Sequence, residues 1–228
     1  MNATTLRSVL SVIGLTFFVA GCAALPEAYP PPANPFLAGA PSLEEAKSLQ
    51  PTKVGLVWLK PLNADAPSDA AQRALAEKIT SQFTAGKRLE IVGSVTVSAA
   101  DGDTLAGIRK ASAPLKVQQV LVVMPKGVEV VSPAWIKYGR DGSAVGTSTD
   151  SYVTVSLVAL DLTTGKSLFS AVASGEARLL AADYEDARPW YPRISPGRSS
   201  AFIYPDKAAF PPGEVRAIAL EDAVKGLI

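Results

Sequence analysis

Three short apolar runs separated by two segments of helical spacing constrain the fold of this chain most strongly. In the first helical segment, Ala71, Leu75, Ile79 and Phe83 recur every four residues, so they lie on one face of a helix. Strands that alternate with helices favour a layered α/β domain with right-handed crossover connections. The order strand, helix, strand, helix, strand is predicted for Lys53–Lys60, Ser68–Thr84, Leu89–Val92, Asp103–Ser112 and Val117–Met124.

In the second half of the chain, side chains alternate between two faces, as they do in antiparallel strands. Val117–Met124 is almost continuously apolar, as in a strand covered on both faces, and the pattern changes at Pro125–Gly127. Asp150–Leu162 then alternates between two faces, and Ser167–Arg178 is expected to return beside it. We therefore predict an α/β fold of the α+β type with a mixed sheet: strand-helix-strand-helix-strand, an antiparallel meander, and a C-terminal helix. The remaining predicted features are turns at Gly139–Gly142 and Thr163–Lys166 and a helix at Glu214–Ile228.

The amino terminus has the features of a bacterial export signal. Arg7 precedes an apolar run, Val9–Ala20, which is 12 residues long and too short to cross a bilayer. The run ends in Val19-Ala20-Gly21-Cys22, which resembles the lipobox of bacterial lipoproteins. The resemblance implies cleavage before Cys22, acylation of that cysteine and, because Ala23 is not aspartate, sorting to the outer membrane. The alternative is a buried free cysteine.

These features predict three regions. Residues 1–21 form a signal peptide, residues 22–51 a lipidated proline-rich tether, and residues 52–228 a single α/β domain with a loop at 182–212. The alternative for the proline-rich segment is an arm that packs on the domain through Tyr29, Phe36 and Leu37. Cleavage would remove Arg7 and leave 21 basic and 21 acidic residues, so net charge predicts no nucleic-acid partner.

The loop at 182–212 holds the candidate binding residues. Arginine and aromatic side chains alternate there with prolines, and these residue types are enriched at binding hot spots. The loop therefore predicts contact with an envelope protein or a cell-wall sugar, while the alternative is a loop that only covers the edge of the domain. The candidate partner-binding residues are Arg188, Trp190, Tyr191, Arg193, Arg198 and Tyr204.

The predicted order of elements resembles the α/β domain of the curli-secretion lipoprotein CsgG and the amino-terminal domain of TolB. The segments Ile79–Phe83 and Ala159–Phe169 are similar to rhombotarget lipoproteins. These resemblances imply an envelope protein that binds or assembles, and they bring no catalytic residue. The pore-forming relatives use long membrane hairpins, and we expect no such hairpin here; Tyr152–Arg178 is predicted to be a soluble hairpin.

Enzymatic chemistry has little support in the sequence. The chain has no histidine, the usual general base and commonest metal ligand, and one cysteine. Gly165-Lys166-Ser167 resembles the end of a phosphate-binding loop but lacks its first glycine, so we predict a hairpin turn there. We expect a non-catalytic lipoprotein without metal or cofactor, held at the membrane by Cys22. The alternatives are a secretion-channel subunit, or a hydrolase that uses Asp183, Glu185 or Asp186.

Overall fold

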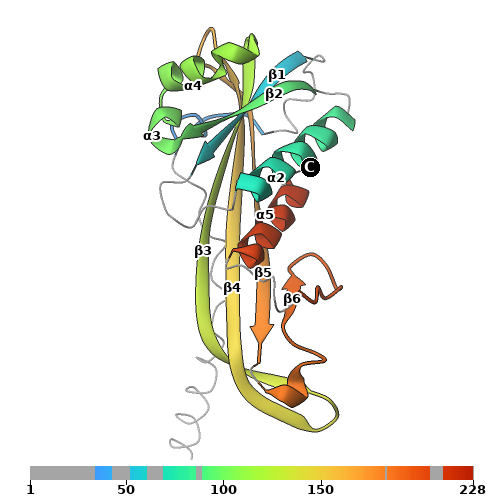
Figure 1. Cartoon of the computed structure of the whole chain (residues 1–228). Coiled ribbons are helices and arrows are strands. Elements are labelled where there is room, and N and C mark those ends of the chain that lie inside the picture. Colours follow the sequence, from blue (N-terminus) through green and yellow to red (C-terminus); the bar gives the residue numbers. More distant parts are fainter. Residues whose placement is uncertain are drawn as a thin grey trace, which may run out of the picture.

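The computed structural model describes residues 34–42, 52–60, 69–85, 89–182, 184–205 and 213–227. It confirms the predicted fold class: strands and helices alternate in the first half, antiparallel strands follow, and a helix comes last (Figure 1). The elements are β1 Thr52–Lys60, α2 Asp69–Ala85, β2 Leu89–Ser98, α3 Ala99–Gly102, α4 Leu105–Ser112, the 3₁₀ turn η1 Ala113–Leu115, β3 Gln119–Tyr138, β4 Gly142–Asp161, β5 Ser167–Ala181, the 3₁₀ turn η2 Glu185–Ala187, β6 Arg193–Pro196 and α5 Glu214–Gly226.

The described strands form one mixed sheet in the order β2-β1-β3-β4-β5-β6. β1 lies parallel to both β2 and β3, as expected for strands joined by helical crossovers. β3, β4, β5 and β6 pair antiparallel, which is the predicted meander. The mixed sheet thus joins a parallel edge to an antiparallel ribbon through the single strand β3.

The ribbon contains a hairpin that is longer than the sequence predicted. β3 and β4 are each 20 residues long and pair without interruption from Gln119↔Asp161 to Tyr138↔Gly142. Figure 1 shows the hairpin extending well beyond the helices and curling at its far end. The predicted break at Pro125–Gly127 was therefore wrong, because β3 continues through these residues.

Two prolines explain why the full length of the hairpin was not predicted. Proline has no N–H, so unbroken pairing of β3 with β4 requires the backbone of Pro125 and Pro133 to face away from β4. Their separation of eight residues puts both on the same side of β3. β1 pairs only with Gln119–Val123, so both prolines lie where β3 has no second neighbour among the described strands. Proline is tolerated at such an edge, where it also discourages further strand pairing.

Two apolar layers cover the sheet where the helices lie. On one face, α2 and α5 pack against alternate residues of β4, among them Val153, Val155 and Leu157. On the other face, α4 packs against Val158 and Leu160 of the same strand. β3 is buried from Val120 to Met124, which confirms that this run is covered on both faces.

The turn between β4 and β5 is a hairpin turn, as predicted. Asp161 Oδ1 accepts hydrogen bonds from the backbone N–H groups of Thr163 and Thr164, each at 2.8 Å. These bonds, the bond from Thr164 foremost, hold the pKa of Asp161 below its usual value. Gly165 has a φ of +74°, which glycine adopts without strain. Strand β5 follows directly, so this segment does not open a helix as a phosphate-binding loop would.

Part of the proline-rich segment packs on the domain. The Ser167 hydroxyl donates a hydrogen bond to the Phe36 carbonyl at 2.7 Å, and the Ser170 N–H donates one to the Pro41 carbonyl at 2.7 Å. Phe36 and Leu37 also lie against the apolar layer next to α4. For residues 34–42 the structure therefore favours the packed arm over the free tether. Cys22 and the predicted signal peptide lie outside the described residues, and none of the described helices is long and apolar enough to span a membrane.

We predict that Gly175→Ala destabilises the domain. An added Cβ would overlap the backbone nitrogen of Ala223 and the carbonyl oxygen of Ala219, so α5 would have to move off β5. Alanine alone would favour the strand by about 0.5–1 kcal/mol, but overpacking against backbone costs about 1–3 kcal/mol. We expect a net loss in the free energy of unfolding measured by urea denaturation. Val172→Ala, at an exposed position of the same strand, is the control; a Gly175→Ala protein at least as stable as wild type would contradict the prediction.

Candidate binding surface

The candidate surface lies at the far end of the β3–β4 hairpin. We call Val131–Thr149 the distal hairpin and residues 184–205 the arginine–aromatic loop. Figure 1 shows the loop, with η2 and β6, lying beside the distal hairpin and away from α2 and α4. The two faces of the distal hairpin differ: one packs against the loop, and we call it the inner face, while the other is the outer face.

Tyr191 fixes the loop to the inner face. Its ring is buried with Ile136 and Ala187, and its hydroxyl donates a hydrogen bond to the Lys137 carbonyl at 2.8 Å. Only 2% of Tyr191 is exposed, so this predicted binding residue cannot offer its ring to a partner. We therefore assign Tyr191 a positioning role.

Arg193 orders the middle of the loop. Its guanidinium carbon lies 4.9 Å from the centre of the Tyr191 ring and 4.5 Å from that of Phe202. Cation–π contacts of this kind hold two ring systems together through one charge. Beside it, Ile194 and Ile203 exchange two backbone hydrogen bonds of 2.8 and 2.9 Å. Residues 193–203 therefore form a small folded segment that pairs with β5 through β6.

Arg198 fixes the middle of this segment to α5. Its backbone N–H donates to Asp222 Oδ1 at 3.1 Å, and its guanidinium donates to the Ser174 carbonyl at 3.0 Å. The Asp222 carboxylate is buried, and its Oδ2 also accepts from the Glu176 N–H at 3.3 Å. Asp222 therefore joins β5, α5 and the loop at one point, and Arg198 acts in this junction.

The other three predicted residues remain on the surface. Trp190 and Tyr204 are 40% and 57% exposed, and the Trp190 ring lies 6.5 Å from that of Tyr138. Arg188 forms an exposed ion pair with Glu185 at 3.6 Å. Phe202, which sequence reasoning did not select, is 46% exposed and 6.5 Å from the Tyr204 ring. The structure thus separates the loop into buried supports and exposed aromatic side chains.

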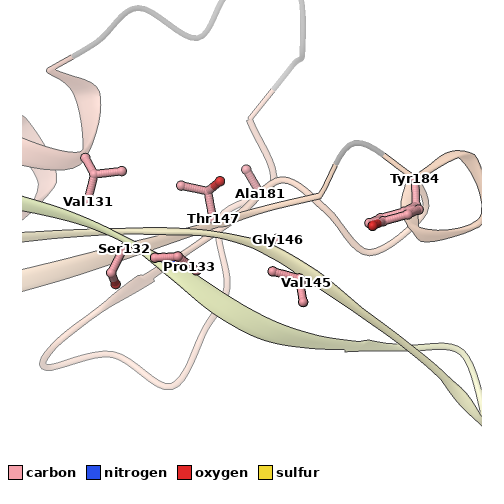
Figure 2. Close-up of a pocket in the computed structure, with 8 residues that line it drawn as sticks. All are labelled: Val131, Ser132, Pro133, Val145, Gly146, Thr147, Ala181 and Tyr184. Carbon is pink, nitrogen blue, oxygen red and sulfur yellow. The ribbon is translucent and has the colours of Figure 1, made fainter.

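The outer face carries a groove that the sequence did not predict. The groove has a volume of about 700 Å³, and Figure 2 shows its lining residues on β3, on β4, at the end of β5 and in the loop that follows. Trp135 is 75% exposed and lies directly opposite Val145, one of the lining residues. The available signal was the spacing of Val131, Pro133 and Trp135, which puts all three on one face of a strand. The groove is lined by Val131, Ser132, Pro133, Val145, Gly146, Thr147, Ala181 and Tyr184.

The outer face continues the face that α5 covers. Val145 and Thr147 are separated by even numbers of residues from Val153 and Val155, so they point to the same side of β4. The α5 layer extends to Glu129, which binds Arg216 at 3.2 Å. Beyond that ion pair the sheet face is bare among the described residues, and a groove without charged lining residues binds through shape and apolar contact.

A charged pair stands on the opposite side of the strands that form the groove. Asp150 on β4 accepts a hydrogen bond from the guanidinium of Arg178 on β5, and this bond raises the pKa of Arg178 above its ordinary value. The pair joins β4 to β5 next to the distal hairpin. It stiffens the base of the ribbon without adding charge to the groove.

The structure describes only part of the predicted carboxylate cluster. Asp183 lies outside the described residues, and the Glu185 side chain is 86% exposed in its ion pair with Arg188. Glu185 and Asp186 form the first turn of η2. In the described part of the chain, acidic and cysteine side chains form no group that could hold a metal ion.

Comparisons with known proteins give no family and only distant structural neighbours. No family model and no curated protein matches the chain. A neuraminyllactose-binding hemagglutinin homolog from Helicobacter pylori has 11% identity over 70% of this chain and 81% of its own, with a TM-score of 0.28. The hypothetical protein CT253 from Chlamydia trachomatis has 12% identity over 77% and 95%, with a TM-score of 0.32. At such scores neither neighbour carries an argument about function.

We predict that Asp222→Ala loosens the loop and destabilises the domain. Two backbone N–H groups lose their acceptor, and the Arg198 guanidinium loses its ion-pair partner at 3.7 Å. Hydrogen bonds to a charged group contribute about 1.5–3 kcal/mol. We expect a loss of that order in urea denaturation and faster hydrogen exchange across residues 193–204. Glu221→Ala is the matched control, because its half-exposed ion pairs with Lys78 and Lys225 contribute about 1 kcal/mol or less. Equal losses in the two variants would contradict the role given to Asp222.

Proposed function

We propose that the protein is a non-catalytic lipoprotein of the outer membrane that faces the periplasm and binds another envelope component through the arginine–aromatic loop. The observation that carries this proposal is the division of the loop into a fixed base and exposed aromatic rings. Tyr191, Arg193 and Arg198 have internal contacts, while Trp190 and Tyr204 keep much of their surface exposed. A loop ordered in this way loses little conformational entropy on binding.

The chemistry of the exposed rings favours a protein partner. Trp190, Phe202 and Tyr204 present large, partly apolar surfaces, and Arg188 is exposed in its ion pair with Glu185. Aromatic residues and arginine dominate hot spots in protein interfaces. A cell-wall sugar could stack on the same rings, so a sugar is the alternative ligand that the crosslinking experiment below distinguishes.

The lipid anchor is supported by sequence. The lipobox-like Val19-Ala20-Gly21-Cys22 places the sole cysteine of the chain directly after an apolar run of signal-peptide length. Acyl chains contribute about 0.8 kcal/mol for each buried CH₂, so several chains on one residue give stable attachment. The binding loop would then act close to a membrane surface.

A secretion-channel subunit is the second candidate function, and the long hairpin is the observation that favours it. The distal hairpin extends beyond the helices and exposes Val131, Trp135 and Val145 on its outer face. A channel requires a ring of many copies, so conductance across planar bilayers by a high-order assembly would favour this candidate. Conductance at background level would leave the binding function as the better account.

We predict that Cys22→Ser abolishes lipid attachment. Serine lacks the sulfur that a lipoprotein joins to diacylglycerol, so incorporation of an alkyne-labelled fatty acid should fall to background. The protein should also leave the outer-membrane fraction after cell fractionation. Ala24→Ser, two residues further along, should keep full labelling. Unchanged labelling of the Cys22→Ser protein would refute the anchor.

We predict that Trp190→Ala together with Tyr204→Ala weakens capture of the partner by roughly tenfold or more, as expected for loss of hot-spot side chains. The measurement is photo-crosslinking in intact cells from a reactive residue at Phe202, with the crosslinked species identified by mass spectrometry. A peptide adduct would identify a protein partner and a glycan adduct the sugar alternative. Val172→Ala serves as the control, since Val172 is also half-exposed but lies outside the loop. Equal capture by both variants would mean that the loop only covers the domain edge.

A further inference from the structure

The outer face of the distal hairpin combines a protruding side chain with a hollow of matching chemistry. Trp135 is the most exposed large apolar side chain among the described residues, and it stands next to the groove lined by Val131, Pro133 and Val145. Exposed apolar patches of this kind mark interaction sites in soluble domains. Because projection and groove occupy the same face, two copies of the chain could each insert a tryptophan into the other.

We propose that the outer face of the distal hairpin binds a second copy of this chain around a two-fold axis near Pro133. In such an isologous contact, residue i of one copy meets residue j of the other, and j meets i. Trp135 and Val131 are each two residues from Pro133, so an antiparallel arrangement places Trp135 of one copy over Val131 of the other.

The charges on β3 fit the same axis. Lys137 and Glu129 are each four residues from Pro133, roughly 13 Å along a strand, on the same face as Trp135. The two-fold arrangement therefore brings Lys137 of one copy toward Glu129 of the other. Lys137 is exposed, and Glu129 already binds Arg216 at 3.2 Å, so the added lysine would extend an existing ion pair. The centre of this contact, formed by Val131, Pro133 and Trp135 of each copy, contains no charged side chain.

This contact is separate from the proposed partner site. Trp190 and Tyr191 of the arginine–aromatic loop pack on the inner face of the distal hairpin, whereas Trp135 projects from the outer face. Of the loop, only its first residue, Tyr184, lines the groove on the outer face. The dimer also continues the packing of the fold, because the second hairpin would cover the sheet face where α5 stops. Self-association and partner binding can therefore be tested separately, each with one tryptophan-to-alanine substitution.

The first experiment measures the mass of the full chain, purified in detergent, by light scattering across a concentration series. We expect a reversible dimer, and we expect Trp135→Ala to raise its dissociation constant about tenfold or more. Trp190→Ala is the matched control and should leave the dimer unchanged while it weakens partner capture. A wild-type monomer at all concentrations, a ring of higher order, or an unaffected dimer in Trp135→Ala would each overturn the proposal.

The second experiment tests the axis itself. In a Cys22→Ser background, Pro133→Cys leaves one cysteine, and a residue on a two-fold axis meets its own counterpart. We expect mild oxidation to yield a disulfide-linked dimer of Pro133→Cys in high yield, whereas Val172→Cys should stay monomeric on reducing-agent-free gels. If Pro133→Cys crosslinks no better than Val172→Cys, the copies do not meet at this face. Capture of a foreign protein by Trp135 in a monomeric chain would likewise overturn the proposal.

Discussion

The uninterrupted pairing of β3 with β4 is the constraint on which the rest of the structure depends. It extends over 20 residues although β3 contains Pro125 and Pro133, and this is feasible because both prolines face away from β4. Near the helices the hairpin is the centre of the mixed sheet, and at its far end it supports the loop. The β3–β4 pair therefore connects the packed core to a surface that lies far from it.

The loop depends on that hairpin for its shape. Tyr191 binds the Lys137 carbonyl near the hairpin turn, whereas Asp222 on α5 binds the backbone of Arg198. The loop is thus held at two points that belong to different layers. Its exposed rings flank the segment between these points: Trp190 precedes Tyr191, and Phe202 and Tyr204 follow Arg198. A surface built in this way keeps its geometry without a binding partner, since buried polar contacts and not the partner fix the backbone.

Sequence periodicity predicted the elements that are covered by helices and missed those that are not. Leu75, Ile79 and Val117–Met124 revealed α2 and the buried part of β3 because a core imposes a regular apolar pattern. The distal hairpin has a core on its inner face only, and Pro125 resembles the end of a strand when its neighbours are unknown. In the loop, residue type selected the right segment, but it could not tell the buried Tyr191 from the exposed Trp190, because that difference depends on contacts with Ile136 and Tyr138.

The two faces of the distal hairpin follow from strand alternation. Ile136 and Ala144 point inward and are buried under the loop, so Trp135 and Val145 must point outward. Trp135 is 75% exposed, so most of its surface makes no contact within the described chain, and large apolar side chains exposed in a patch mark interaction sites. The structure therefore carries two distinct apolar surfaces back to back on one pair of strands, and the described residues cover only the inner one.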